Sequence, residues 1–370
     1  MIRAPIGLVL AAFSLFSPPA LTAGPSEPED LLREELARLI HESERPEIAR
    51  GLGAERVAAV GERALQVEGL LDVGDWLGSL RPLAELVRVV ELTVRSEGIA
   101  SAAEDMDAVD ELGAAFREDF EGRPSPLAGK ERRPAALQAL LEDAHGRARG
   151  FLTSASRQGH ETRLEAGVYY LASAMTEARL AELLTAIPAS ETHATVEVPG
   201  LDDLLLRLEE ELVDLYRPPL SQERHATFIR LSSTLKLARE LRDSQLVLGA
   251  VEHALDVRRG LSLFGAPEDS PPLEASDRER LEKRLAGIVA RIGASDASLA
   301  NVYVARARAL IADGAEADGA GADGSGDGLL ARVLVEDVLP EYLACLEHEQ
   351  KPQSADSATV TVTLVRWPFT

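Results

Sequence analysis

The sequence predicts an all-α protein of stacked antiparallel helical hairpins, arranged either as an α-solenoid-like stack or as two helical lobes. Apolar residues recur at steps of three and four along almost the whole chain, which is the period of an amphipathic helix. Ala, Leu, Glu and Arg dominate the sequence, and all four favour helix. Runs of β-branched residues are few, so we expect at most one short pair of β-strands.

The same periodicity places the individual helices, and segments rich in Pro and Gly separate them. We expect helices at 28–43, 46–69, 73–97, 99–121, 134–158, 160–187, 201–216, 221–259, 276–293, 296–312 and 328–347. The long segment 221–259 is either one helix or two with a break near Asp243 and Ser244. Ser221 is a candidate N-terminal cap for it, and Gly260 a candidate stop. Short connections make antiparallel neighbours the default arrangement.

Two short segments alternate polar and apolar residues, as strands do. They are 192–198 (THATVEV) and 359–365 (TVTVTLV). They could pair with each other, or the second could be a terminal arm that adds to another molecule. A loosely ordered tail is an equal alternative for residues 348–370.

The N-terminus has the layout of a secretory signal peptide. Arg3 precedes an apolar run at 6–16, which is followed by Pro18 and Pro19, and we expect cleavage after Ala23. The apolar run is about half of the ~20 residues that cross a bilayer, so an uncleaved anchor is the weaker alternative. The mature protein is then exported, to the periplasm or the medium, without stable membrane insertion.

The length of the mature chain exceeds the ~250–300 residues at which a single core stops growing. We therefore expect an N-terminal helical lobe at 24–190 and a C-terminal lobe at 200–347, followed by the tail. The formal charge of −23 disfavours nucleic acid and anionic lipid as partners. It fits a soluble protein with a cationic partner or a divalent cation. Only four lysines accompany many arginines, which favours a GC-rich bacterial coding sequence.

The strongest chemical pattern is the acidic, Gly-rich segment 313–328, which ends in DGSGDG. Asp323, Ser325 and Asp327 occupy the first, third and fifth positions of an EF-hand-like calcium loop, and Gly328 the sixth. The twelfth position is Leu334, which offers no oxygen ligand. We therefore prefer a flexible linker between two helices and keep Ca²⁺ as the alternative.

Other candidate sites are incomplete. Glu142 and His145 have the Glu-x-x-His spacing of di-iron helices, but a second copy is absent, so we expect His145 on a solvated helix face. The single cysteine, Cys345, excludes an intramolecular disulfide and is expected to be a small buried residue on a helix. Zinc-protease, nucleophile-elbow and phosphate-loop motifs do not occur.

These observations favour an exported, non-catalytic interaction or scaffold protein that acts through its surface on a protein partner. Two other classes stay open. One is a periplasmic binding protein that holds a cation or a small ligand between helices. The other is an enzyme whose site is assembled from residues far apart in the sequence. No catalytic or cofactor-binding residue can be assigned from the sequence.

Overall fold

The structure is a computed structural model, and it describes residues 27–103, 105–123, 133–158, 164–188, 197–216, 221–266, 273–292, 298–316 and 325–347. Within these ranges the protein is all-α, without a strand, and consists of packed antiparallel helix pairs. The predicted fold class is therefore confirmed. Of the two strand predictions, residues 192–196 and 359–365 lie outside the described ranges, and Glu197 and Val198 are not in a strand.

The single helix predicted at 46–69 is wrong, because Gly53, with a left-handed φ of 79°, separates two helices there. The helices otherwise follow the predicted order. They are α2 (Pro28–Glu44), α3 (Pro46–Leu52), α4 (Ala54–Asp72), α5 (Trp76–Ala102), α6 (Met106–Gly122), α7 (Ala135–Gln158), α8 (Leu164–Ala186), α9 (Leu201–Leu215), α10 (Gln222–Asp243), α11 (Val247–Gly265), α12 (Ala275–Ile292), α13 (Ser298–Glu316), α14 (Ser325–Val333), the π-helical turn η2 (Leu334–Val338) and α15 (Leu339–Glu347). None of the described helices combines the length and the apolar composition needed to span a bilayer.

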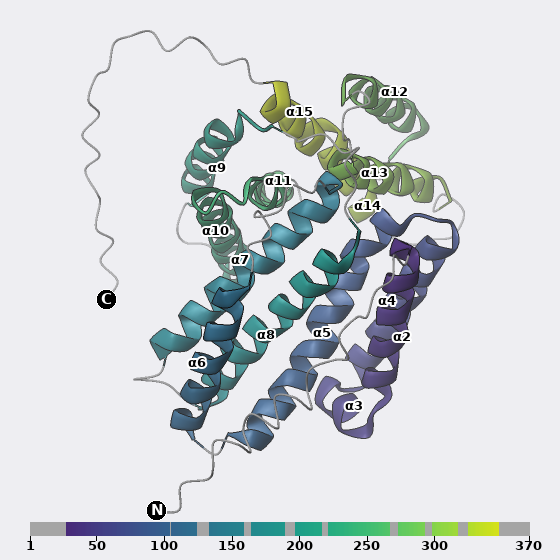
Figure 1. Cartoon of the computed structure of the whole chain (residues 1–370). Coiled ribbons are helices and arrows are strands. Elements are labelled where there is room, and N and C mark those ends of the chain that lie inside the picture. The colour runs from purple at the N-terminus through teal and green to yellow at the C-terminus, as the bar shows by residue number, and fades with distance from the viewer. Residues whose placement is uncertain are drawn as a thin grey trace, which may run out of the picture.

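Three long helices, α5, α7 and α8, form the middle of the molecule (Figure 1). The helices α2, α3 and α4 pack on α5, and α6 packs on α7 and α8. Of the remaining helices, α9, α10, α14, η2 and α15 contact α11, which also packs on α7. Helices α12 and α13 pack on each other, on η2 and on α15. Helix α7 therefore contacts both groups of helices, and the contact between α7 and α11 joins them.

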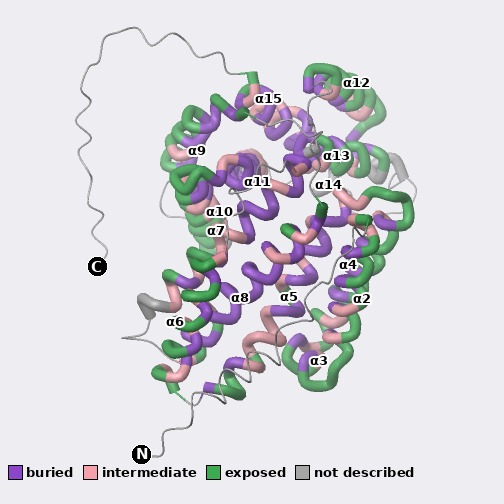
Figure 2. The backbone as a smooth tube through the Cα atoms, viewed as in Figure 1, coloured by how far each residue is buried: buried purple, intermediate pink, exposed green. Residues whose placement is uncertain are grey.

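Burial follows this arrangement, with purple segments concentrated on the central helices and green ones on the outer helices (Figure 2). One apolar cluster lies among α9–α15 and the start of α7, and two others lie among α2–α8. Helix α8 is buried on nearly all sides, because α5, α6 and α7 all pack against it. Such a helix must pair any polar side chain that it carries. The proposed division into lobes at residue 190 stays a prediction.

Side-chain caps define several helix starts. The Asp75 carboxylate accepts the N–H of Gly78 at 2.9 Å at the start of α5, and Asp105 accepts that of Ala108 at 3.0 Å at the start of α6. The Ser221 hydroxyl accepts the N–H of Arg224 at the start of α10, as predicted. Each cap satisfies a backbone donor that the helix itself leaves free.

The long segment 221–259 is two helices. Helix α10 ends at Asp243, where the N–H of Leu246 donates to Leu241 O and that of Gln245 donates to Arg242 O. This is the Schellman pattern, and Gln245 has the left-handed φ of 64° that the pattern requires. The prediction of Gly260 as a stop is wrong, because α11 continues to Gly265. A side chain at Gly260 would clash with Leu231 of α10, so this glycine serves close packing.

The π-helical turn η2 interrupts the last helix just before Pro340. Pro340 has no N–H, so the carbonyl of Glu336 four residues earlier loses its usual helical partner. Arg284 Nη2 donates to that carbonyl at 3.4 Å, and Leu339 N–H donates to Leu334 O across the wider turn. One proline thus accounts for a helix that widens without ending.

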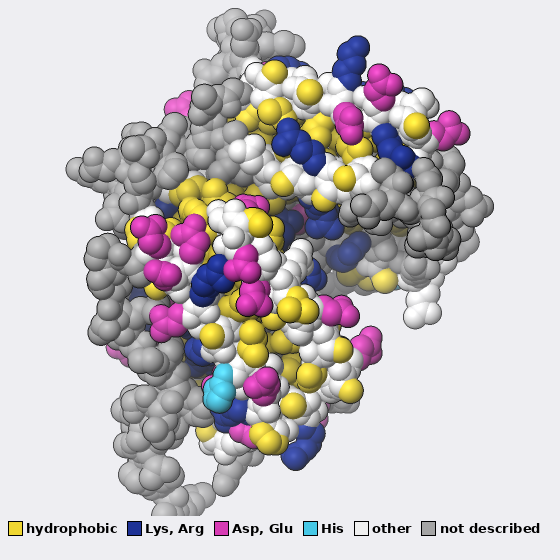
Figure 3. Space-filling model, turned by 90° about the vertical axis from the view of Figure 1, so that its right-hand side faces the viewer, with side chains coloured by type: hydrophobic (Ala, Val, Ile, Leu, Met, Phe, Trp, Pro, Cys, Tyr) yellow, Lys and Arg dark blue, Asp and Glu magenta, His cyan; other side chains and the backbone are white. Residues whose placement is uncertain are grey.

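One side of the molecule is hollowed. Figure 3 shows the hollow between the upper part of the molecule, where α12 and α13 lie, and the lower part, formed by α2 and α4, with Lys or Arg side chains gathered in it.

Candidate functional site: buried ion-pair centres between the helices

The most enclosed polar site surrounds the carboxylate of Asp143 on α7. Arg88 of α5 donates to Asp143 Oδ2 at 2.6 Å, and Arg147 donates to Oδ1 at 2.6 Å. His253 of α11 places its Nε2 2.6 Å from the same Oδ1. Arg88 also pairs with Glu177 of α8, with its Nε 2.9 Å from Oε1. These five residues, named here the Asp143 centre, connect four helices.

The pKa values of Asp143 and Glu177, the two acids of this centre, are shifted in opposite directions. Burial would raise the pKa of Asp143, but His253, Arg147 and Arg88 outweigh it and hold that pKa well below its ordinary value of 3.8. Burial raises the pKa of Glu177 more than Arg88 lowers it, and the nearby charge of Asp143 raises it further. Asp143 is therefore ionised and balances the surrounding cations.

Close approach of α7 and α11 makes the centre possible. A Cβ added to Gly249 would lie 3.0 Å from Glu142 Cβ and 3.1 Å from the Asp143 backbone nitrogen. Because position 249 has no side chain, the start of α11 rests directly on α7. The buried Glu142 carboxylate then accepts the N–H of Gly249 at 2.9 Å and caps α11 from another helix.

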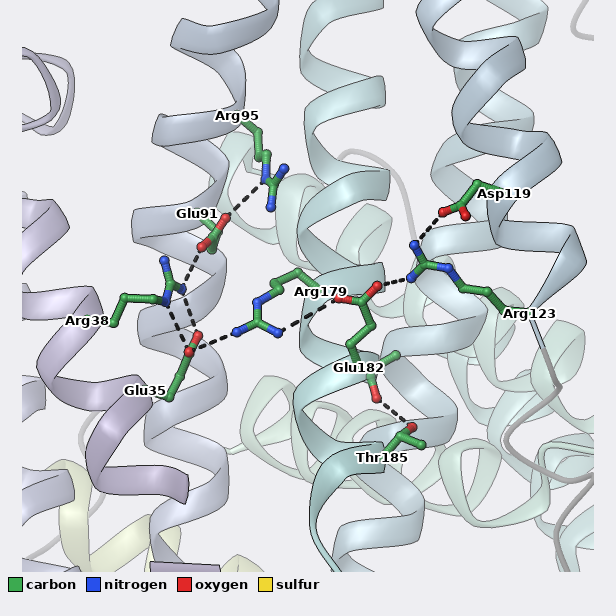
Figure 4. A network of polar contacts seen from close by, with 10 residues as sticks. Glu35, Arg38, Glu91, Arg95, Asp119, Arg123, Arg179, Glu182 and Thr185 are labelled. Atoms are coloured by element: carbon green, nitrogen blue, oxygen red, sulfur yellow. Dashed lines mark hydrogen bonds and ion pairs between the residues drawn. The ribbon is translucent and has the colours of Figure 1, made fainter. Parts of the chain in front are cut away.

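A second network crosses α2, α5, α6 and α8 (Figure 4). Buried Glu35 and Glu91 both pair with Arg38, with Oε1 to Nη2 distances of 2.7 and 2.5 Å. Arg179 of α8, itself buried, donates to Glu35 at 3.1 Å. Arg95 pairs with Glu91 on one side. On the other side, charges alternate from Arg179 to the surface through Glu182, Arg123 and Asp119.

The chemistry open to the Asp143 centre is limited by access. A carboxylate that orients a histidine is also the arrangement of a general base. A catalytic histidine exposes its other nitrogen to substrate, whereas His253 is 3% exposed and its buried Nδ1 has no hydrogen-bond partner among the described residues. In this form the pair joins α7 to α11. Among the described residues, no group of three or more His, Cys, Asp or Glu side chains is placed to hold a metal ion.

The predicted calcium ligands fall at the edge of the described ranges. Asp323 lies outside them, and Ser325 and Asp327 belong to the first turn of α14, with side chains that are not described. Gly328 follows in the same helix and packs on Leu273. The choice between a linker and a Ca²⁺ site stays a prediction.

Two other sequence candidates can be placed. Cys345 is 1% exposed on α15, and burial raises the pKa of its thiol to about 12, so the prediction of a buried structural cysteine is confirmed. His145 is half-buried and stacks on Phe120, with ring centroids 5.1 Å apart. The prediction of a solvated His145 is therefore wrong, because α6 covers that face of α7.

Sequence reasoning did not identify the Asp143 centre. Helix α8 carried one usable signal, because TEAR at 176–179 interrupts a helix that is otherwise apolar on most sides. Charges in such a helix predict buried partners. Arg88 and Asp143 lie on other helices, far from α8 in the sequence, and no local pattern identifies them as partners.

Comparison with protein-family models, with curated proteins and with solved structures found no match. The functional argument therefore proceeds from the residues of this chain.

Proposed function

We propose that this protein is a non-catalytic interaction or scaffold protein, in which a helical body held together by buried ion pairs presents its surface to a protein partner. The Asp143 centre is the observation that carries this proposal. Its carboxylates and cations pair with one another across α5, α7, α8 and α11. They therefore fix the helices relative to each other, which a rigid binding surface requires.

The alternative of an enzyme receives less support from this geometry. General acid–base catalysis needs a titratable group within hydrogen-bond reach of a substrate. His253, Asp143 and Glu177 are all less than 5% exposed. A substrate would reach them only after α7 and α11 separate, and that separation would break the Arg88 and His253 contacts.

Export is part of the same proposal. The signal-like segment 1–23 lies outside the described residues, so its support is the sequence pattern alone. We expect the mature protein to begin at Gly24. N-terminal sequencing of protein recovered from the periplasm or medium of a Gram-negative host tests this, and recovery of a chain that begins at Met1 in the cytoplasm would refute it.

The partner itself can be tested by photo-crosslinking in the cells that produce the protein. Photoreactive residues replace the exposed apolar side chains Leu206 and Val213 of α9, which are 54% and 60% exposed. The matched positions are Leu65 and Val73, at and just beyond α4, which are 70% and 77% exposed.

A partner that covers one surface should give an adduct of one defined mass from one pair of positions and none from the other. This contrast supports an interaction protein, because size and apolar character are similar at both pairs. Either no adduct at any of the four positions or the same mixture of adducts at all of them would contradict the proposal.

A further inference from the structure

A cluster of arginines lies where α5, α11 and α13 meet, and it is separate from the Asp143 centre. Arg81 of α5 forms an ion pair with Glu252 of α11. One turn further along α11, Arg259 Nη2 lies 3.2 Å from Asp256 Oδ1. Tyr303 and Arg306, both on α13, complete the junction. Two carboxylates and three guanidinium groups thus share this junction, named here the Arg306 cluster, in a chain whose formal charge is −23.

Tyr303 supplies a buried donor that no described residue accepts from. Its side chain is 3% exposed, and its hydroxyl has no hydrogen-bond partner within the described part of the chain. Arg81 Cζ lies 5.9 Å from the centre of its ring. Burial raises the pKa of the phenol, and the charge of Asp256 raises it further, so the hydroxyl keeps its proton. A buried hydroxyl without a partner costs free energy unless a ligand or water accepts from it.

Arg306 supplies a cation without an ion-pair partner among the described residues. No ion pair or hydrogen bond joins it to another residue that the structure describes. Arg306 lies one turn after Tyr303 on the same face of α13. Partial burial and the positive charges of Arg259 and Arg81 lower its pKa, and the charges of Glu85 and Asp256 raise it. The side chain is exposed, so a ligand can approach from solvent. Figure 3 shows Lys or Arg side chains gathered in the hollow on this side of the molecule.

We propose that the Arg306 cluster binds a small oxyanion, the carboxylate or phosphate group of a soluble ligand, between α5, α11 and α13. Arg306 and Arg259 donate from their guanidinium forks, which match the geometry of such groups. The Tyr303 hydroxyl donates to a third oxygen position. Binding of this kind goes beyond the proposed protein partner and does not depend on it.

Isothermal calorimetry on the purified full mature chain tests this site, with inorganic phosphate in one arm and succinate in the other. Sodium chloride at the same ionic strength controls for general screening. The test variant is Arg306→Gln, and the matched control is Arg308→Gln, which removes the same charge from an exposed position of the same helix. Tyr303→Phe removes only the hydroxyl.

We expect saturable binding of at least one of the two anions by the wild-type chain and by Arg308→Gln. Arg306→Gln should weaken it about tenfold or more, since one charge-assisted contact is lost. Tyr303→Phe should weaken it while leaving the fold intact, because the lost hydroxyl has no partner in the described protein. Binding of phosphate alone or succinate alone identifies the group recognised.

The proposal fails if neither anion binds saturably, or if Arg306→Gln and Arg308→Gln weaken binding equally. Neither result would bear on the protein partner, which the crosslinking experiment examines at α4 and α9. A failed crosslinking experiment would likewise leave the anion site standing.

Discussion

Glu142 shows how one buried carboxylate makes stability depend on pH. Burial raises its pKa from the ordinary 4.5 to about 6, although Gly249, Gln138 and Leu248 each donate to it and favour the charged form. In the pH range between these two values the folded protein binds more protons than the unfolded chain, so stability falls as pH rises. The difference between the two pKa values corresponds to about 2 kcal/mol of stability, which is present below the unfolded pKa and fully lost above the folded pKa.

Glu142→Gln removes the cost of burying an ionised carboxylate and keeps an oxygen that can accept from the Gly249 N–H. We expect the variant to gain up to about 2 kcal/mol relative to wild type on going from pH 4 to pH 7.5. Urea denaturation at the two pH values measures the gain. Glu68→Gln, at an exposed position of α4, is the control and should show no such change. An equal difference between wild type and Glu142→Gln at both pH values would contradict this account.

At the same scale, the sequence predicts a residue well when its own neighbours decide its environment. Cys345 lies on an apolar stripe, and burial follows from that stripe alone. Glu142 lies next to an equally readable stripe, yet its role depends on Gly249, which is 107 positions away. The incomplete Glu-x-x-His spacing led us to expect a solvated His145, whereas the structure directs Glu142 to α11 and stacks His145 on Phe120.

Helix ends illustrate the scale of the element. Helix α4 ends with Gly74 at a φ of 77°, where the N–H of Asp75 donates to Leu70 O. Helix α10 ends in the same Schellman pattern with Gln245. A left-handed conformation costs a residue with a Cβ roughly 1 kcal/mol, and glycine nothing comparable.

Two opposite substitutions test that difference. Gln245→Gly should stabilise the protein by up to about 1 kcal/mol, and Gly74→Ala should destabilise it by about the same amount. A Cβ at Gly74 would meet no atom within 4 Å, so any loss there reflects the backbone alone. Thermal unfolding of both variants measures the pair of shifts, and shifts of the same sign would contradict the assignment of both turns.

These two turns also explain which helix ends could be predicted. Gly74 belongs to the residue type that favours a left-handed cap, and the predicted break between 69 and 73 lies close to it. Gln245 does not belong to that residue type, and the sequence of 221–259 therefore allowed either one helix or two. Pro340 lies inside the helix predicted at 328–347, and the helix does continue past it through η2, where Arg284 donates to the carbonyl that the proline leaves without its usual partner. Boundaries set by tertiary contacts are invisible in a local pattern.

For the whole molecule, helical periodicity was sufficient to predict the all-α class, because each amphipathic helix must bury its own stripe. It could not predict that α8 would be enclosed by α5, α6 and α7. The ion pairs of Glu177 and Arg179 depend on that enclosure. They join residues that are 89 and 144 positions apart in the sequence. The candidate site was therefore beyond a reading of one sequence, although the fold class was not.

The Asp143 centre should contribute to stability far more than an exposed ion pair of similar geometry. Asp143→Asn leaves Arg88, Arg147 and His253 facing a neutral amide in the interior, and loss of one partner of a buried pair typically costs about 3–5 kcal/mol. Asp202→Asn is the matched control, because Asp202 also accepts two arginine hydrogen bonds, both of 2.6 Å, but at the surface. Solvent screens that pair, so little change is expected.

Urea denaturation at pH 7 compares the two variants. Since Asp143 contacts residues of α5 and α11 alike, its loss should lower the midpoint of the whole transition. Equal losses in both variants would show that the centre does not hold the molecule together.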